Sequence, residues 1–435
     1  MESPSLKHER ASVAEECEAS SRIFGWWHIA PANARRALFA AALGWMLDSF
    51  DVMLYALVLA SLMTDLGLSK EGAGILGSIT LVAAAIGGLV FGVAADRYGR
   101  TRALMASILI YAVFTAACGF SQSFVQLAIF RLFVGFGMGG EWASGASLVA
   151  ETWPDEHRGK ALGLMQSSWA IGYALAAVVA AFVMPWGGWR AVFFVGIVPA
   201  FFTLWIRNGV KEPEIWKNSI ATVTSSFGGF TELFQRRFAR FTIVLTLMNA
   251  CTLFAWWGFN LWVPAYLSLP EERGGIGLAP RIMLAIIVAM QVGMWFGYVT
   301  FGFVSDFVGR KPTYVAYLLA AALLLFIYGA VHAPWLLLTV GSLVAFFGTG
   351  YYSGFAAVTA EIYPTHIRAT AQGFTYNTGR IASALAPFSV GSLAETHSFR
   401  AAFSVAAASF LLAAVCWVWI PETRGRSMAL EEQAK

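Results

Sequence analysis

The sequence carries little charge and lacks the residue patterns that hold metals or cofactors. Only 12% of its 435 residues are Asp, Glu, Lys or Arg, about half the share found in a soluble domain. Hydrophobic residues make up 58%, and the mean hydropathy is +0.65. No two of the four cysteines have metal-ligand spacing, and there is no nucleotide-binding loop. The composition therefore predicts a membrane protein with no metal and no cofactor, and not an enzyme.

About twelve apolar runs follow one another along the chain, each long enough to cross about 30 Å of hydrocarbon as a helix. They lie near 37–62, 72–94, 103–121, 124–150, 160–184, 189–209, 239–268, 279–304, 312–332, 334–361, 369–394 and 399–420. We therefore expect an all-α membrane protein with twelve transmembrane helices.

The distribution of basic residues predicts the orientation. Of the 29 Lys and Arg residues, 22 fall on one side of the predicted spans, five on the other side and two within spans. The more basic side faces the cytoplasm, so we expect both termini and the polar segment 210–238 to be cytoplasmic. The net charge of +4 follows from this bias and indicates no nucleic-acid partner. The first 36 residues show no signal-peptide pattern, and we expect the plasma membrane.

The chain repeats itself with one offset of 210 residues. The matching segments are FGVAADRYGR at 91–100 with FGFVSDFVGR at 301–310, 151–163 with 361–373, and 189–196 with 399–406. A constant offset over three separated segments predicts two homologous six-helix halves, related by an axis along the membrane normal. The predicted divisions are a tail at 1–36, a half at 37–209, a linker at 210–238, a half at 239–420 and a tail at 421–435.

The pattern G-x-x-x-D-R-x-G-R-T-R at 92–102 resembles the loop between the second and third helices of the major facilitator superfamily. The resemblance covers essentially the whole chain and implies transport by alternating access. KEPE at 211–214 and PETRG at 421–425 resemble the Pro-Glu patterns that close each half in sugar-porter-like members.

Charged residues cluster at this loop in both halves. We interpret them as a cytoplasmic gate that closes in one conformation and opens in the other; the alternative is a solvated turn. The gate residues would be Asp96, Arg97, Arg100, Glu151 and Arg158 in the first half, and Asp306, Arg310, Glu361 and Arg368 in the second.

Two carboxylates interrupt the first apolar run, in GWMLDSFDVMLY at 44–55. Asp48 and Asp51 are three residues apart, so they share a helix face. An ionised group in the bilayer is costly, and this face should look into the bundle or a water-filled cavity. The alternative is a pair that only ties helices together through hydrogen bonds.

The fourth run adds Arg131 and Glu141. Arg131 should lie roughly 10 Å below the outer end of its span, at the depth of Asp51. An Asp of the first helix and an Arg of the fourth interact in the proton-coupled sugar porters that this arrangement resembles. All six histidines fall in loops, tails or span ends. We therefore expect a proton to be carried by Asp48, Asp51 or Glu141 rather than by histidine.

Arg380 is the second cation inside a span and should lie near the midplane, roughly 16 Å deep. No acidic residue shares its span at helical spacing, so it favours a carboxylate ligand; the alternative is a salt bridge to another helix. Tyr376 and Asn377 lie one turn earlier. Further candidates for the cavity lining are Gln166, Trp169, Tyr173, Asn249, Trp256, Asn260, Gln291, Tyr351 and Tyr352.

L-D-S-F-D at 47–51 resembles the D-x-x-D of aromatic-acid:proton and sialate/lactate:proton symporters. G-M-G-G-E-W at 137–142 resembles the second branch, as does Ser49 in place of the usual Gly. The resemblance implies proton-coupled uptake of a small organic acid, with the anion, the proton and the lipid bilayer as partners of a monomer. A porter of sugars or other neutral solutes, a drug:proton antiporter and a non-transporting receptor remain alternatives.

Overall fold

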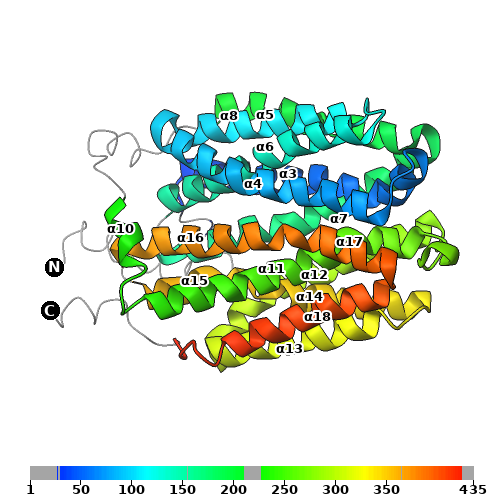
Figure 1. The fold of residues 1–435 in the computed structure, drawn as a ribbon. Helices are drawn as coiled ribbons and strands as arrows, with labels where there is room; N and C mark the ends of the chain where they lie inside the picture. The colour runs from blue at the N-terminus through cyan, green and yellow to red at the C-terminus, as the bar shows by residue number, and fades with distance from the viewer. Residues whose placement is uncertain (1–26, 28–29, 154, 210–226, 364, 424–435) are drawn as a thin grey trace, which may run out of the picture.

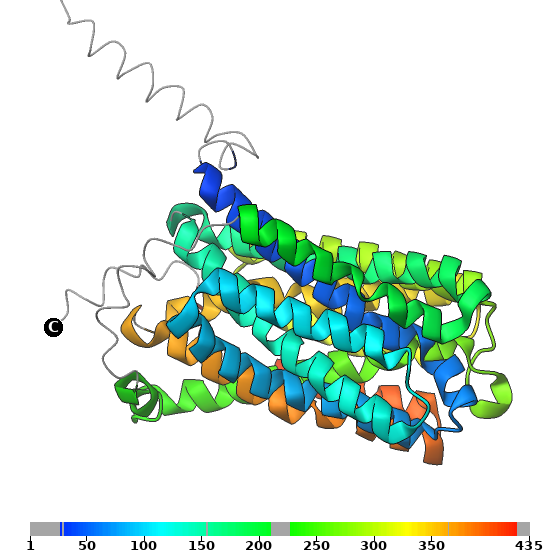
Figure 2. The same cartoon turned by 90° about the horizontal axis from the view of Figure 1, so that it is seen from above.

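The computed structural model describes residue 27 and residues 30–153, 155–209, 227–363 and 365–423. In these ranges every regular element is a helix. The helices lie side by side in a bundle (Figure 1), which Figure 2 shows from above. We call the end with the connection between the first two long helices, residues 66–69, the outer end. The inner end holds the turns at Gly99 and Gly309.

Six of the described helices precede the linker, and the first four follow the predicted runs closely. They are α3 (Ala32–Asp65), α4 (Lys70–Tyr98), α5 (Arg100–Cys118), α6 (Phe124–Thr152), α7 (Asp155–Val195) and α8 (Val198–Gly209). Within α7 the chain turns at Gly188, where φ is 64°. Because this left-handed conformation suits glycine, Gly188 separates the fifth apolar run from the sixth.

A short helix within the predicted linker precedes the first span of the second half. Its elements are α10 (Phe227–Glu232), α11 (Ala239–Ser268), the 3-10 turn η2 (Glu271–Arg273), α12 (Pro280–Val308), α13 (Arg310–Tyr328), α14 (Pro334–Gly350), α15 (Tyr352–Ile362), α16 (Thr365–Ser383), α17 (Leu385–Thr396) and α18 (Phe399–Cys416). The tenth predicted run is thus divided between α14 and α15, and the eleventh between α16 and α17. Pro387 lacks the N–H that would bond to the Ser383 carbonyl, which explains the second break.

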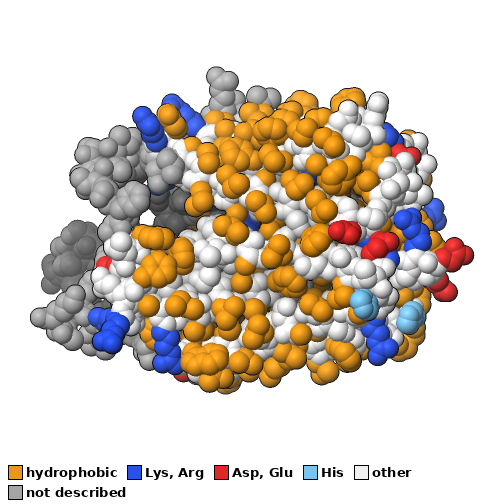
Figure 3. Space-filling view, in the orientation of Figure 1, with side chains coloured by type: hydrophobic (Ala, Val, Ile, Leu, Met, Phe, Trp, Pro, Cys, Tyr) orange, Lys and Arg blue, Asp and Glu red, His pale blue; other side chains and the backbone are white. Residues whose placement is uncertain are grey.

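Ten of the described helical segments are long and apolar enough to cross a membrane. One of them, Lys160–Thr203, contains two predicted runs, and α16 with α17 makes up the eleventh run. The predicted all-α fold with twelve spans is therefore confirmed. Figure 3 shows the corresponding surface, an apolar belt with charged side chains gathered toward the two ends of the bundle.

Glycines allow the helices of the first half to pack with their backbones in contact. A Cβ atom at Gly135 or Gly139 of α6 would overlap the α4 backbone at Thr80 or Ala84. Small residues serve this purpose in membranes because lipid supplies no hydrophobic force between helices. The close packing fixes α6 against its neighbours, and α6 carries Arg131 and Glu141.

Candidate functional site

Three carboxylates and an arginine lie buried in the described part of the first half. On α3, Asp48 and Asp51 are each 0% exposed, and on α6, Arg131 and Glu141 are 1% and 0% exposed. Their helices pack against one another, so the polar face of α3 looks into the bundle as expected for ionisable groups in a membrane.

Asp48 and Glu141 belong to one polar cluster with Tyr111 of α5. The Glu141 carboxylate lies over Gly44, one turn before Asp48: a Cβ at Gly44 would be 2.6 Å from its Oε1. The Tyr111 hydroxyl is within electrostatic reach of Asp48, Glu141 and Asp51 and is fully buried. The glycine at position 44 therefore provides the space that the Glu141 carboxylate occupies.

Asp51 and Arg131 form a second group, one turn toward the outer end. The Arg131 guanidinium carbon lies 4.3 Å from the centroid of the Tyr55 ring, a cation–π contact. Thr115 and Arg131 are polar neighbours of Asp51. Asp51 and Arg131 thus lie near each other without a salt bridge among the described residues.

These buried polar atoms lack hydrogen bonds to the rest of the described chain. Both carboxylate oxygens of Asp48, Asp51 and Glu141 have no partner there, nor do Nε and Nη1 of Arg131. Most buried polar atoms in folded proteins are paired, and an unpaired charge in a membrane is costly. The group is therefore suited to bind a proton or another small polar ligand.

The second half contributes Arg380, in the last turn of α16. It is 3% exposed, and in the described part of the chain its guanidinium has no ion pair or hydrogen bond. Asp48 is within electrostatic reach of it, although the two belong to opposite halves. A buried guanidinium without a partner offers a planar, two-pronged donor to a carboxylate.

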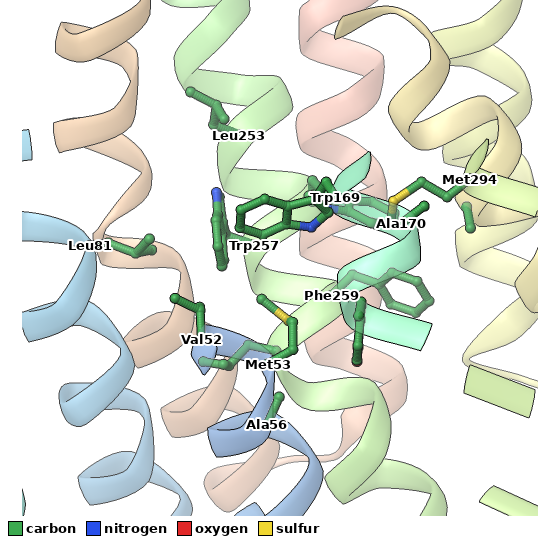
Figure 4. Packing of buried hydrophobic residues seen from close by; sticks show 14 of the residues in the cluster. Val52, Met53, Ala56, Leu81, Trp169, Ala170, Leu253, Trp257, Phe259 and Met294 are labelled. Carbon is green, nitrogen blue, oxygen red and sulfur yellow. The ribbon is translucent and has the colours of Figure 1, made fainter. Parts of the chain in front are cut away.

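Three tryptophans lie across the interface between the halves. Trp45 of α3 and Trp169 of α7 have ring centroids 4.7 Å apart, and Trp257 of α11 meets Trp169 edge-on at 6.0 Å. Figure 4 shows Trp169 beside Trp257. The Ser49 hydroxyl donates to the Trp169 carbonyl at 2.8 Å and joins α3 to α7. These rings form a continuous aromatic contact from α3 through α7 to α11 of the second half.

The other predicted lining residues are buried or half-buried on their helices. Asn377 Nδ2 donates to the Gly373 carbonyl at 3.0 Å, and Asn260 Nδ2 to Met53 Sδ, across the halves, at 3.5 Å. Oxygen atoms remain without a described partner in Gln166 (Oε1), Asn260 (Oδ1) and Tyr351 (the hydroxyl). Tyr376, one turn before Arg380, is half-buried. Their assignment to the substrate stays a prediction.

The sequence reasoning missed Tyr111, Thr115, Tyr55, Trp45 and Trp257. Two signals could have found them. Tyr55 is one turn after Asp51 and shares its face, and Tyr111 stands in the middle of a 19-residue helix, far from the membrane surfaces where tyrosine usually gathers. The tryptophans give no such signal, because aromatic residues are frequent throughout the runs.

At the inner end, the predicted gate of the second half forms a network. Arg310 pairs with Asp306 at 2.5 Å and with Glu361 at 3.2 Å. Glu422 accepts hydrogen bonds from the backbone N–H groups of Arg310 and Lys311 at 2.9 and 3.0 Å. All these residues belong to one half, so the described network ties α12, α13 and α15 together.

The first half is described less fully at this end. Arg97 is exposed and Arg100 half-buried. Asp96, Glu151, Arg158 and Arg368, the last in the second half, have side chains outside the described part of the structure. The proposed gate therefore stays a prediction.

Comparison with known proteins gives a consistent result. The family model described as Major Facilitator Superfamily matches residues 41–290 and 269–435. A probable 4-methylmuconolactone transporter of Cupriavidus pinatubonensis is 33% identical, over 93% of this chain and 94% of that protein. The cis,cis-muconate transport protein of Acinetobacter baylyi is 34% identical, over 87% and 92%. The crystal structure of a D-xylose-proton symporter is 22% identical, with a TM-score of 0.73 over 91% of this chain and 100% of that one.

Proposed function

Because the chain belongs to the major facilitator superfamily and is therefore a membrane transporter and not an enzyme, we propose that it takes up a small organic acid together with a proton. Arg380 would bind the carboxylate of the substrate, and Asp48, Asp51 and Glu141 would carry the proton. The protein would act as a monomer in the plasma membrane, with both termini in the cytoplasm.

The observation that carries the proposal is the state of Arg380. Its guanidinium is 3% exposed and has no ion pair within the described structure. A carboxylate would supply charge and two hydrogen-bond acceptors at once. The relatives named for transport of muconate and a muconolactone support a small unsaturated acid, for which the tryptophan surface offers an apolar, planar contact.

The position of Asp48 supports proton coupling. Arg380 is a cation within electrostatic reach of Asp48. A substrate carboxylate on Arg380 would neutralise that cation. The negative charge of Asp48 would then lose the electrostatic stabilisation that Arg380 provides. A carboxyl group in an apolar site without a counter-ion is more stable when protonated. Binding of the anion would thereby favour binding of a proton in the opposite half.

Asp51 and Arg131 would release the proton. They lie near each other without a salt bridge, so a small shift of α3 against α6 could form or separate the pair. An adjacent guanidinium favours the charged carboxylate, and desolvation favours the neutral one. During the transport cycle, Asp51 would alternate between pairing with Arg131, which favours its charged form, and separation from it, which favours its protonated form.

The direct test is transport by purified protein in proteoliposomes. Counterflow with lactate, pyruvate, benzoates, muconate and sialic acid identifies the substrate class, and the best substrate is then followed with an imposed inward proton gradient. We expect concentrative uptake that collapses on addition of a protonophore. Undiminished accumulation without the gradient would exclude proton coupling. Competition by a neutral amide as strong as that by its acid would favour the neutral-solute porter.

A further inference from the structure

The outer end is held together by an exchange of helix-end contacts between the two halves. Lys70 is the first residue of α4, and its backbone N–H donates to Glu395 Oε2 of α17 at 2.8 Å. In return, Lys70 Nζ donates to the carbonyl of Ala394, in the last turn of α17, at 3.0 Å. Each helix end leaves such backbone groups unsatisfied by its own helix. Here each is satisfied by a charged side chain from the opposite half.

The charges also suit the two helix ends. A carboxylate is favourable at a helix N-terminus and an ammonium group at a C-terminus, because of the helix dipole. Lys70 is only 7% exposed, and its Nζ lies 5.3 Å from the centroid of the Phe399 ring. Lys70 has therefore given up most of its hydration to make these contacts.

Glycines bring the two helices close enough for this exchange. A Cβ at Gly391 of α17 would be 2.5 Å from the Lys70 carbonyl oxygen, and one at Gly77 of α4 would be 3.0 Å from Pro387 Cβ. Figure 1 shows α17 beside α4 at the outer end. The contacts of α4 with the second half lie mostly on α17 and only to a small extent on α16. The halves are thus in contact at their outer ends.

The symmetry-related interface, between α12 and α7, cannot form the same contacts. The 210-residue offset places Pro280 at the position of Lys70 and Pro185 at the position of Glu395. Pro280 begins α12, and proline has neither a backbone N–H nor a charged side chain. The exchange therefore exists on one of the two outer interfaces only, and the fold alone does not explain it.

We propose that Lys70 and Glu395 form an outer latch, which stabilises the conformation closed at the outer end and must open when the transporter faces outward. Both charges regain water when the helices separate, so the latch shifts the equilibrium between the two conformations without preventing the movement. The inference rests on the family's alternating access and not on the nature of the substrate.

The test uses two cysteine reporters and needs no substrate. Ser78→Cys reports on the outer path, because the Ser78 hydroxyl accepts a hydrogen bond from the Phe388 N–H at 3.3 Å between α4 and α17. Gly373→Cys reports on the inner half of α16, where a Cβ would meet no atom within 4 Å. Cys17 is replaced by Ser, and Cys118, Cys251 and Cys416 are buried. A membrane-impermeant maleimide is applied to right-side-out and inside-out vesicles.

We expect Glu395→Ala or Lys70→Met to raise the labelling rate of the outer reporter about tenfold and to lower that of the inner reporter, since charge-assisted helix-end bonds are lost. The double variant should add little to either change, because each substitution removes the same latch. The matched controls are Glu71→Ala, exposed and next to Lys70, and Arg281→Met, exposed at the start of α12. Both should leave the rates within twofold.

Two results would overturn the latch. Unchanged labelling of both reporters in the double variant would show that the contacts do not bias the conformations. Faster labelling of both reporters would show that the substitutions only loosen the bundle. Neither result bears on proton coupling or on the acid substrate, which are tested separately by transport.

Discussion

The two halves share one backbone plan but differ completely in their buried charge. α5 and α13 each have 19 residues, and they begin 210 residues apart. At the same offset, the positions of Arg131 and Glu141 are taken by Gly341 and Tyr351, and that of Arg380 by Ala170. Among the described residues, the first half thus has three buried carboxylates together with Arg131, and the second half has the buried Arg380 and no buried carboxylate. The two halves thus share a backbone plan but not their buried charges, and on the proposed function the proton and the anion would influence each other across the interface.

The strongest way to test this difference between the halves is to replace a proposed proton carrier of the first half. Asp51→Asn should abolish concentrative uptake, because a neutral amide cannot bind and release the proton. Exchange of substrate across the membrane should persist at least in part, since exchange need not move the proton. Both are measured in the same proteoliposomes. If the variant still concentrates substrate like the unaltered protein, Asp48 or Glu141 carries the proton.

The next test changes the anion site in the second half. Arg380→Lys should lower the affinity for the acid roughly ten- to hundredfold, as expected when a buried charge-assisted bond worth about 1.5–3 kcal/mol is lost. A lysine ammonium keeps the charge but cannot reproduce the planar contact of arginine. The measurement is competition by an acid and by its amide.

Ser383→Ala is the matched control for Arg380→Lys. Ser383 lies on the same helix, and its hydroxyl donates only to the Arg380 carbonyl, at 2.8 Å. The affinity of the Ser383→Ala variant for the acid should stay within about twofold of that of the unaltered protein. Equal competition by acid and amide in the unaltered protein would mean that Arg380 has a structural role. The proposal that the second half binds the anion would then be wrong.

A smaller effect should follow from filling the space that the Glu141 carboxylate occupies. Gly44→Ala places a methyl group 2.6 Å from the present position of Glu141 Oε1, so the carboxylate must move. A strain of about 1 kcal/mol would lower uptake roughly fivefold. Gly163→Ala, which meets no atom within 4 Å, is the control. Equal uptake by both variants would show that the position of Glu141 is unimportant.

The last test concerns stability rather than transport, and compares two carboxylates at the inner end that bind the same arginine. The side chain of Glu361 is 15% exposed and that of Asp306 is 68% exposed. Glu361→Gln should therefore cost about 1–3 kcal/mol of stability, and Asp306→Asn about 1 kcal/mol or less. Thermal unfolding in detergent measures both. A larger loss for Asp306→Asn would contradict the burial argument.

The fold was predictable from the sequence because its signals are strong. A run such as 239–268 can only be a span at this hydropathy, and α11 has the same bounds. The breaks within spans were not predicted. Pro387 gives a hint of the division between α16 and α17, but Pro264 lies inside the continuous helix α11. Tertiary packing decides which proline interrupts its helix.

The candidate site was predictable residue by residue but not as a set of neighbours. Asp48, Asp51, Arg131, Glu141 and Arg380 stand out because charge is rare in apolar runs. Their grouping was not evident. Estimates of depth in the membrane predicted that Asp51 and Arg131 lie at the same level. The position of Arg380 near Asp48, in contrast, depends on how the two halves meet. Lys70 and Glu395 lie just outside the ends of two predicted runs, and no local pattern links residues 325 positions apart.

The break at Ala384 gives the eleventh span a mechanical property that a continuous helix would lack. It divides the span into two helical segments: α16, which ends three residues after Arg380, and α17, which carries Glu395 near its far end. A change of angle between the two segments at this joint would move Arg380 relative to the outer contact with α4. On the proposed function, such a joint would link substrate binding at Arg380 to closure of the outer end.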